Sequence, residues 1–183
     1  MNRTIKETSD GSKTLYVNSL DETYHSHHGA IQEAEHVFIK NGIKQLNINE
    51  INILELGFGT GLNVLVTINE FLKNEGIHKI NYFTMEKYPI NAVEISELNY
   101  SQHFSVENME NINQKIHEVE WEKSVEIIPN FHLHKIKQDF FNLEKINLPP
   151  IDLVYFDCFG ARVQPDLWEE KLIKMVTDKI KVG

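Results

Sequence analysis

One run of residues carries most of the information in this chain: Ile51-Asn52-Ile53-Leu54-Glu55-Leu56-Gly57-Phe58-Gly59-Thr60-Gly61-Leu62-Asn63. It begins with β-branched and apolar residues, which are typical of a buried strand. Three glycines at every second position follow, and apolar residues then recur with helical spacing. Strand, glycine turn and helix form the first half of a βαβ unit. The run therefore predicts an α/β protein whose glycine turn allows a ligand to lie against the main chain.

The spacing of the glycines narrows the class of ligand. A dinucleotide fingerprint that starts at Gly57 would need a third glycine where Leu62 stands, and no Lys-Ser or Lys-Thr pair completes a phosphate loop. The remaining pattern, E-x-G-x-G-x-G from Glu55 to Gly61, resembles the first motif of class I S-adenosylmethionine (SAM) methyltransferases. The resemblance implies that Glu55 lies near the amino-acid part of SAM and that the glycines lie under its carboxylate and adenosine. The alternative is a glycine-rich turn of some other α/β protein.

Composition limits the remaining possibilities. The 183 residues allow one domain with a sizeable core, and 41% hydrophobic and 25% charged residues are ordinary for a globular protein. No apolar run reaches the ~18 residues of a membrane span, and no signal peptide is recognisable, so we expect a cytoplasmic protein without a membrane partner. The single cysteine, Cys158, fits a reducing compartment. A net charge of −9 disfavours a general nucleic-acid binder but allows a local basic patch.

Two later strands end at acidic residues. Residues 79–85 have strand composition and lead to Glu86. In doubly wound nucleotide folds, an acid at this place binds the ribose hydroxyls; the alternative is a capping acid before Pro89. Residues 131–136 alternate like a half-buried strand and lead to Asp139. The methyltransferase resemblance implies that Asp139 meets the adenine amino group, whereas a turn residue is the alternative.

A fourth apolar strand, residues 151–156, runs directly into Asp157. Open α/β folds place their chemistry at the carboxyl ends of their strands, so Asp157 is the candidate catalytic residue. Pro165 then opens a predicted helix over 166–180, with Ile180 on its apolar face. A seven-stranded methyltransferase sheet needs about three more strands, so we expect this sequence to lack the C-terminal strands of that fold.

The first part of the chain predicts an extension to the sheet domain. We expect a mobile polar start over residues 1–13 and a β-hairpin over residues 14–24. A helix is predicted over residues 31–39. Four histidines lie in this part of the chain, namely His25, His27, His28 and His36. No cysteine or paired carboxylate has metal-ligand spacing with them, so we expect no metal.

The domain organisation follows from these elements. Residues 1–45 form the predicted hairpin and helix extension, and residues 46–183 the SAM-binding, Rossmann-like domain with helices on both faces of its sheet. Pro89 is expected to start a helix. Residues 105–130 are expected to be helical until Pro129.

Several segments together resemble one family, the methyltransferase that makes 5-methylaminomethyl-2-thiouridine in tRNA, either as the methyltransferase domain of MnmC or as the stand-alone MnmD. The matching segments are Glu22-Thr23-Tyr24-His25-Ser26, Gly29-Ala30-Ile31-Gln32-Glu33-Ala34, His36-Val37-Phe38-Ile39, Glu86-Lys87-Tyr88-Pro89, Asp152 to Phe159 and Gln164-Pro165-Asp166-Leu167-Trp168. The most specific of them are the block from Glu22 to Ala34 and the block from Asp152 to Trp168. Together with the glycine motif they span about residues 14–180.

The resemblance implies methyl transfer from SAM to the primary amine of 5-aminomethyl-(2-thio)uridine at the wobble position of tRNA. Asp157 would be the catalytic carboxylate, and Tyr24 and Phe159 are candidates to stack on the uracil. The implied SAM contacts are Glu33, Glu55, Gly57, Gly59, Gly61, Asn63, Glu86 and Asp139. No FAD-binding segment is present, so we expect neither FAD nor the oxidase half of the bifunctional form.

Two other readings compete with this one. The first is a SAM-dependent methyltransferase of a small-molecule amine, which suits the acidic net charge better. The second is a SAM-binding module without catalysis. The sequence leaves the oligomeric state open.

Overall fold

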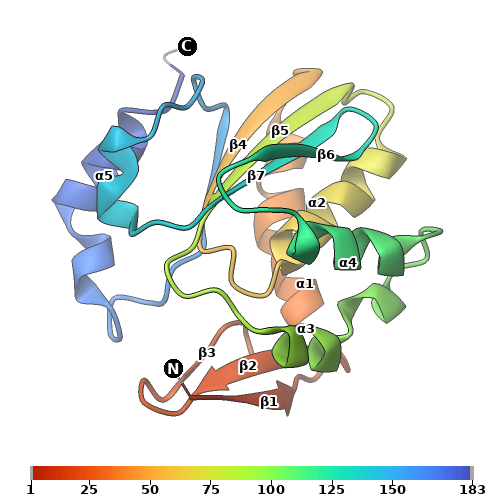
Figure 1. Ribbon diagram of the computed structural model, residues 1–183, viewed down its shortest axis with the longest axis vertical. Helices are drawn as coiled ribbons and strands as arrows, with labels where there is room; N and C mark the ends of the chain where they lie inside the picture. Colours follow the sequence, from red (N-terminus) through yellow and green to blue (C-terminus); the bar gives the residue numbers. More distant parts are fainter. Residues whose placement is uncertain (1, 182–183) are drawn as a thin grey trace. The chain divides into compact units, whose positions relative to one another are not determined.

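The computed structural model describes residues 2–181 (Figure 1), and these residues divide into two compact units. The N-terminal unit comprises Met1–Asn47, Gly59–Glu75 and Ile90–Val119. The sheet unit comprises Ile48–Phe58, Gly76–Pro89 and Glu120–Gly183. Within residues 2–181, no helix is both long enough and apolar enough to cross a bilayer.

The sheet unit is built on a five-stranded sheet of order β6-β7-β5-β4-β8 within the described residues. Strands β7, β5, β4 and β8 are parallel, and β6 is antiparallel to β7 (Figure 1). The carboxyl ends of the four parallel strands therefore lie along one edge. The bounds are β4 (Glu50–Leu56), β5 (Lys79–Met85), β6 (Ser124–Ile128), β7 (Phe131–Ile136) and β8 (Leu153–Phe156).

The four parallel strands were all predicted from the sequence, whereas β6 was not. The expectation that residues 105–130 are helical until Pro129 holds for Met109–Glu118 but is wrong beyond Glu118, because residues 124–128 form β6. Pro129 and Asn130 make the turn into β7, with Asn130 at a φ of 65°. The β-branched residues of β6 therefore pair with β7 as a hairpin.

One face of the sheet packs against α5 (Glu170–Thr177). This helix places Leu172, Met175 and Val176 in a buried cluster with residues such as Leu54 and Met85. In Figure 1, α5 lies beside the sheet in blue. Apolar residues three and four apart form the single stripe that a packed helix presents.

The predicted helix over 166–180 is shorter than expected. Residues Pro165–Trp168 form a 3₁₀ turn, η5, and α5 begins only at Glu170. Ile180 does not lie on the helix; it makes a parallel bridge with Ile151. The N–H of Ile151 donates to the carbonyl of Lys179 at 2.9 Å, which aligns the chain after α5 with the start of the β8 segment.

The N-terminal unit begins with an antiparallel sheet of order β1-β2-β3. The expectation of a mobile start is wrong, because β1 pairs with β2 from Arg3↔Val17 to Glu7↔Lys13. The Asp10 carboxylate closes the turn between them by accepting from the N–H of Ser12 at 2.9 Å. The bounds are β1 (Arg3–Glu7), β2 (Lys13–Val17) and β3 (Glu22–Thr23).

The helices of the N-terminal unit largely match the sequence pattern. The helix predicted over 31–39 begins as α1 and continues as a π-helical turn, η1. The helix expected to start at Pro89 instead begins at Ala92, because Asn91 supplies its cap. The bounds are α1 (Ala30–Ala34), η1 (Glu35–Lys40), η2 (Ile43–Gln45), α2 (Leu62–Lys73), α3 (Ala92–Leu98), η3 (Tyr100–His103) and α4 (Met109–Glu118).

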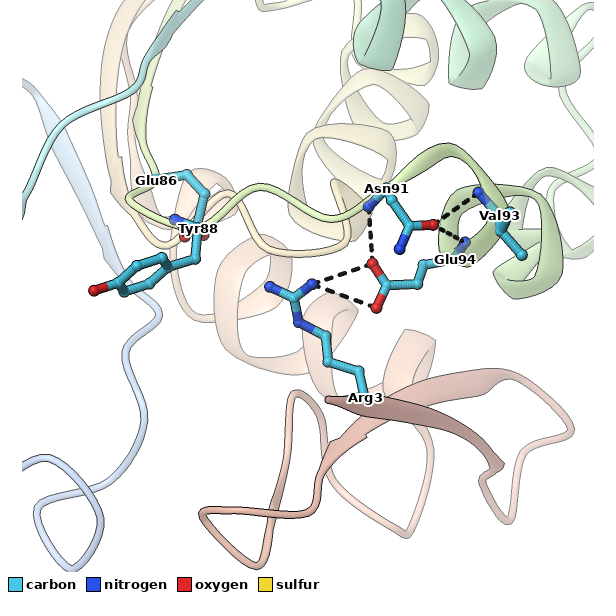
Figure 2. A network of polar contacts seen from close by, with 6 residues as sticks. All are labelled: Arg3, Glu86, Tyr88, Asn91, Val93 and Glu94. Carbon is cyan, nitrogen blue, oxygen red and sulfur yellow. Dashed lines mark hydrogen bonds and ion pairs between the residues drawn. The ribbon is translucent and has the colours of Figure 1, made fainter. Parts of the chain in front are cut away.

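A polar network joins β1 to α3 (Figure 2). The Arg3 guanidinium donates to both carboxylate oxygens of Glu94, at 3.3 and 3.1 Å. Glu94 also accepts the Asn91 N–H at 2.8 Å, and the Asn91 side chain accepts the N–H groups of Val93 and Glu94. This is a capping box whose acid also holds the N-terminal strand.

We predict that Glu94→Ala lowers the free energy of unfolding by about 3 kcal/mol, because it leaves the guanidinium of Arg3 buried without its carboxylate partner. The two side chains are only 6% and 13% exposed. Urea unfolding measures the change. The exposed Glu97 lies on the same helix, and Glu97→Ala should change stability by less than about 0.5 kcal/mol. Equal effects of the two substitutions would contradict the prediction.

Candidate functional site

Backbone hydrogen bonds fix the carboxyl ends of the parallel strands to one another. The Asp157 N–H donates to the carbonyl of Leu56 at 3.0 Å, and the Gly57 N–H donates to the carbonyl of Met85 at 3.0 Å. The Glu86 N–H donates to the last residue of β7 at 3.0 Å. Asp157, Gly57 and Glu86 therefore lie in this order at the tips of neighbouring strands β8, β4 and β5.

Gly57 permits the glycine turn to touch the segment that carries Asp157. Its φ of 104° lies in a region that side chains rarely adopt, and a Cβ at this position would overlap the carbonyl oxygen of Asp157. Only glycine allows this approach without moving one of the two segments. The first glycine of the motif therefore brings the turn into contact with the candidate catalytic segment.

Glu86 and Asp139 differ in how they are held. Glu86 is half-buried, and one carboxylate oxygen accepts the N–H of Tyr88 at 2.7 Å. Asp139 accepts from the Lys87 ammonium at 2.7 Å, and its other oxygen accepts the Phe141 N–H at 3.0 Å, capping the 3₁₀ helix η4 (Phe140–Lys145). The hydrogen bond from Lys87 lowers the pKa of Asp139. The structure therefore gives Asp139 the role of a turn and capping residue, and its contact with adenine stays a prediction.

Glu55 lies inside the sheet unit rather than at the strand tip. It is 0% exposed, and the Thr84 hydroxyl on β5 donates to its carboxylate at 2.6 Å. Burial, together with the nearby Glu55 carboxylate, raises the pKa of Tyr82 well above its usual value. Glu55 is therefore a buried acid set into the sheet two residues before Gly57, and its contact with SAM stays a prediction.

The residues that follow Asp157 are also held by the sheet unit. The Cys158 thiol lies 3.8 Å from the carbonyl oxygen of Leu56. Burial, with a smaller contribution from Asp157, raises the pKa of this thiol far above its usual value, which favours the protonated thiol over the reactive thiolate. Phe159 is half-buried, and its carbonyl accepts the indole N–H of Trp168 at 2.8 Å.

The other predicted site residues belong to the N-terminal unit, namely Tyr24, Glu33, Gly59, Gly61 and Asn63. The Glu33 carboxylate accepts the Ser26 N–H at 2.7 Å, and the Arg3 guanidinium lies 5.8 Å from the centre of the Tyr24 ring. Asn63 is 3% exposed in the first turn of α2. Their proposed contacts with SAM and uracil stay predictions.

Gly59 and Gly61 have positive φ angles of 48° and 75°. A Cβ at Gly61 would lie 3.0 Å from the imidazole of His117 on α4. The last glycine of the motif therefore allows α4 to pack closely against the start of α2.

His25 is a residue of this region to which sequence reasoning gave no role in the site. It is buried, and its Nε2 lies 2.8 Å from the Thr60 hydroxyl, inside the glycine turn. Its backbone N–H donates to the Thr14 hydroxyl at 3.0 Å, and its ring meets Tyr100 edge-on. Its place in the Tyr-His-Ser segment was the one signal of its importance. Among residues 2–181, no three His, Cys, Asp or Glu side chains are arranged to hold a metal, and a metal-free site stays a prediction.

We predict that His25 makes stability depend on pH. Burial lowers the pKa of His25 from 6.5 to about 4, so the unfolded chain takes up a proton before the folded protein does. Stability is therefore greatest above pH ~6.5 and falls as the pH is lowered towards ~4, by up to about 3 kcal/mol from this residue. In urea unfolding at several pH values, His25→Gln should show a smaller loss between these limits. Identical pH profiles for variant and wild type would contradict the assignment.

We predict that Gly57→Ala destabilises the protein, by about 1–3 kcal/mol from backbone strain alone. Further destabilisation comes from overlap with the carbonyl of Asp157. Gly160 is the matched control, because a Cβ there meets nothing within 4 Å. In urea unfolding, Gly160→Ala should have nearly the wild-type free energy of unfolding, whereas that of Gly57→Ala should be clearly lower. A neutral Gly57→Ala would show that the close approach is not required.

No protein-family model matches the chain, but named relatives do. The "tRNA 5-methylaminomethyl-2-thiouridine biosynthesis bifunctional protein MnmC" of Leptospira interrogans is 42% identical over 84 residues, which cover 43% of this chain and 13% of that protein. The protein of the same name from Leptospira borgpetersenii is 27% identical over 174 residues, covering 90% and 26% of the two chains. That of Marinomonas sp. is 24% identical over 172 residues, covering 87% and 25%.

The chain is a relative of the MnmC proteins. These relatives carry the name of the family that the sequence segments resemble, and so they support the resemblance. The chain spans about a quarter or less of the length of these MnmC relatives.

A solved structure supports the fold of this MnmC relative. The crystal structure of MNMC2 from Aquifex aeolicus matches with a TM-score of 0.79 at 24% identity, covering 98% of this chain and 57% of that chain. The predicted α/β fold is thereby confirmed.

Proposed function

We propose that the chain transfers a methyl group from SAM to the primary amine of 5-aminomethyl-(2-thio)uridine at the wobble position of tRNA. The observation that carries the proposal is the contact between Gly57, in the SAM-like motif, and the segment that holds Asp157. It joins a cofactor turn to a carboxylate at the strand edge where α/β enzymes place their chemistry. We place the reaction in the cytoplasm, where tRNA is modified.

The residues of the sheet unit suit SAM as the donor. The turn at Gly57 has no side chain, and the half-buried carboxylate of Glu86 at the adjacent strand tip is an acceptor suited to ribose hydroxyls. The remaining contacts are proposed from the family resemblance: Glu33, Glu55, Gly59, Gly61, Asn63 and Asp139. SAM supplies a methyl group already activated on a sulfonium sulfur, so the proposed reaction requires neither a metal nor FAD.

The role of Asp157 follows from the chemistry of the amine. An aminomethyl group is mostly protonated at neutral pH, and only the free amine can attack the methyl carbon. We propose that the Asp157 carboxylate accepts a hydrogen bond from the amine, orients its lone pair and helps remove its proton. The nitrogen–carbon bond then forms as the carbon–sulfur bond breaks. Tyr24 and Phe159 are the proposed stacking residues for a uracil turned out of the RNA stack.

We predict that Asp157→Asn lowers kcat by about 10²–10⁴-fold while the Kd for SAM changes little, because the amide cannot take the proton. Mass spectrometry of nucleosides from undermodified tRNA measures methyl transfer, and calorimetry measures SAM binding. Asp166 is an exposed acid of the following turn, and Asp166→Asn should leave both quantities unchanged. Unaltered turnover of Asp157→Asn in an enzyme that methylates tRNA would exclude the proposed role.

A small-molecule amine is the second candidate substrate. The net charge of −9 favours it, because RNA phosphates are attracted by basic rather than acidic proteins. Transfer to free amines and to undermodified tRNA, measured in parallel, separates the two. Methylation of free amines alone would reject the tRNA proposal.

A further inference from the structure

Trp168 contacts residues on both sides of Asp157. Its indole N–H donates to the carbonyl of Phe159 at 2.8 Å. Its ring meets Phe156 edge-on, with ring centres 5.3 Å apart at 62°. Phe156 comes directly before Asp157, and Phe159 follows two residues after it. A single side chain from η5 therefore spans the strand end that carries the candidate catalytic carboxylate.

The chain between Phe159 and Trp168 needs such a contact. Residues 160–162 are exposed, and the space around Gly160 is open, so packing does not fix the backbone there. The carbonyl of Gly160 accepts from the N–H groups of Val163 and Gln164, at 2.9 and 3.1 Å, which makes a local turn. The hydrogen bond from Trp168 connects this turn back to Phe159.

Trp168 is nevertheless 46% exposed. A large aromatic side chain so exposed gains only part of the stabilisation that full burial would give. Its hydrogen bond and its edge contact hold it in place despite this exposure. The exposure of Trp168, together with its fixed contacts to Phe156 and Phe159, points to a role beside Asp157 rather than in the core.

We propose that Trp168 is a positioning residue for the proposed methyl transfer, acting through its N–H bond to the carbonyl of Phe159. This bond holds the backbone after Asp157, and with it the direction of the Asp157 carboxylate and of the Phe159 ring. The inference rests on the proposed function. Sequence reasoning used the Gln164–Trp168 segment only to recognise the family. The inference gives Trp168, the last residue of that segment, a physical role.

The expected effect is on turnover rather than on folding. A single neutral hydrogen bond at a partly exposed side chain contributes little to stability. A misplacement of about 1 Å at a reacting group can nevertheless reduce a rate by about 10²-fold. Loss of the N–H should therefore lower kcat and leave binding almost unchanged.

The test is a pair of near-isosteric replacements at position 168 of the full chain. Benzothienylalanine keeps the shape of tryptophan but has sulfur in place of the N–H, whereas 5-fluorotryptophan keeps the N–H. We expect the first to lower kcat by about 10–100-fold, with the KM for tRNA and the Kd for SAM within about threefold of wild type. We expect the second to retain wild-type kcat. The genetically simpler Trp168→Phe should match the benzothienyl variant.

A second measurement separates this inference from the proposed function. Amide hydrogen exchange over residues 157–163 should be faster in the benzothienyl and Phe variants than in wild type or the fluoro variant, whatever the substrate. Wild-type kcat in the benzothienyl variant would overturn the inference while the proposed function stands. If wild type methylates no amine, the proposed function fails. Unchanged exchange in the variants would reject the positioning role of Trp168, whether or not wild type is active.

Discussion

The carbonyl oxygen of Asp157 occupies space that any side chain at position 57 would need, and the remainder of the site depends on this close approach. Gly57 also donates its N–H to the end of β5, and Asp157 donates to the end of β4. The ends of three neighbouring strands are therefore held by contacts that involve the backbone of these two residues. A parallel sheet supplies this alignment because all its strands end at one edge.

Two buried polar contacts support the glycine turn, one in each unit. In the sheet unit, the Thr84 hydroxyl donates to the buried Glu55 carboxylate just before the turn. In the N-terminal unit, the buried His25 lies within hydrogen-bonding distance of Thr60 inside it. Removing one partner of such a pair leaves a buried polar group unsatisfied, which costs more than the bond contributes. The two contacts thus restrict the turn to one conformation rather than adding much to net stability.

The sequence predicted the parallel strands because each carries apolar residues, in a run or at every second position, between clear turns. Strands β1 and β6 were missed because both are short and most of their side chains are exposed or half-buried. Their pairing is decided by partners elsewhere in the chain, namely Lys13–Val17 and Phe131–Ile136. Local composition cannot show such a partner.

The site shows the same contrast between features that are visible locally in the sequence and contacts that depend on distant residues. Glu86 and Asp157 were placed at strand tips because the strands that end there are recognisable. The pairing of Asp139 with Lys87, and of His25 with Thr60, joins residues that are 52 and 35 positions apart. Spacing along the chain carries no information about these contacts, so their partners became visible only with the fold.

Lys135 shows how the sheet tolerates a charge that its strand pattern places inside. Alternation along β7 puts Lys135 on the face of Phe131 and Leu133, and the side chain is 1% exposed. Burial lowers its pKa to about 8. Its ammonium lies 4.9 Å from the centre of the Trp121 ring and 5.5 Å from that of Phe58, whose π faces offset part of the lost hydration. Phe58 belongs to the glycine turn, so the buried cation links β7 to the segment on which the proposed cofactor site is built.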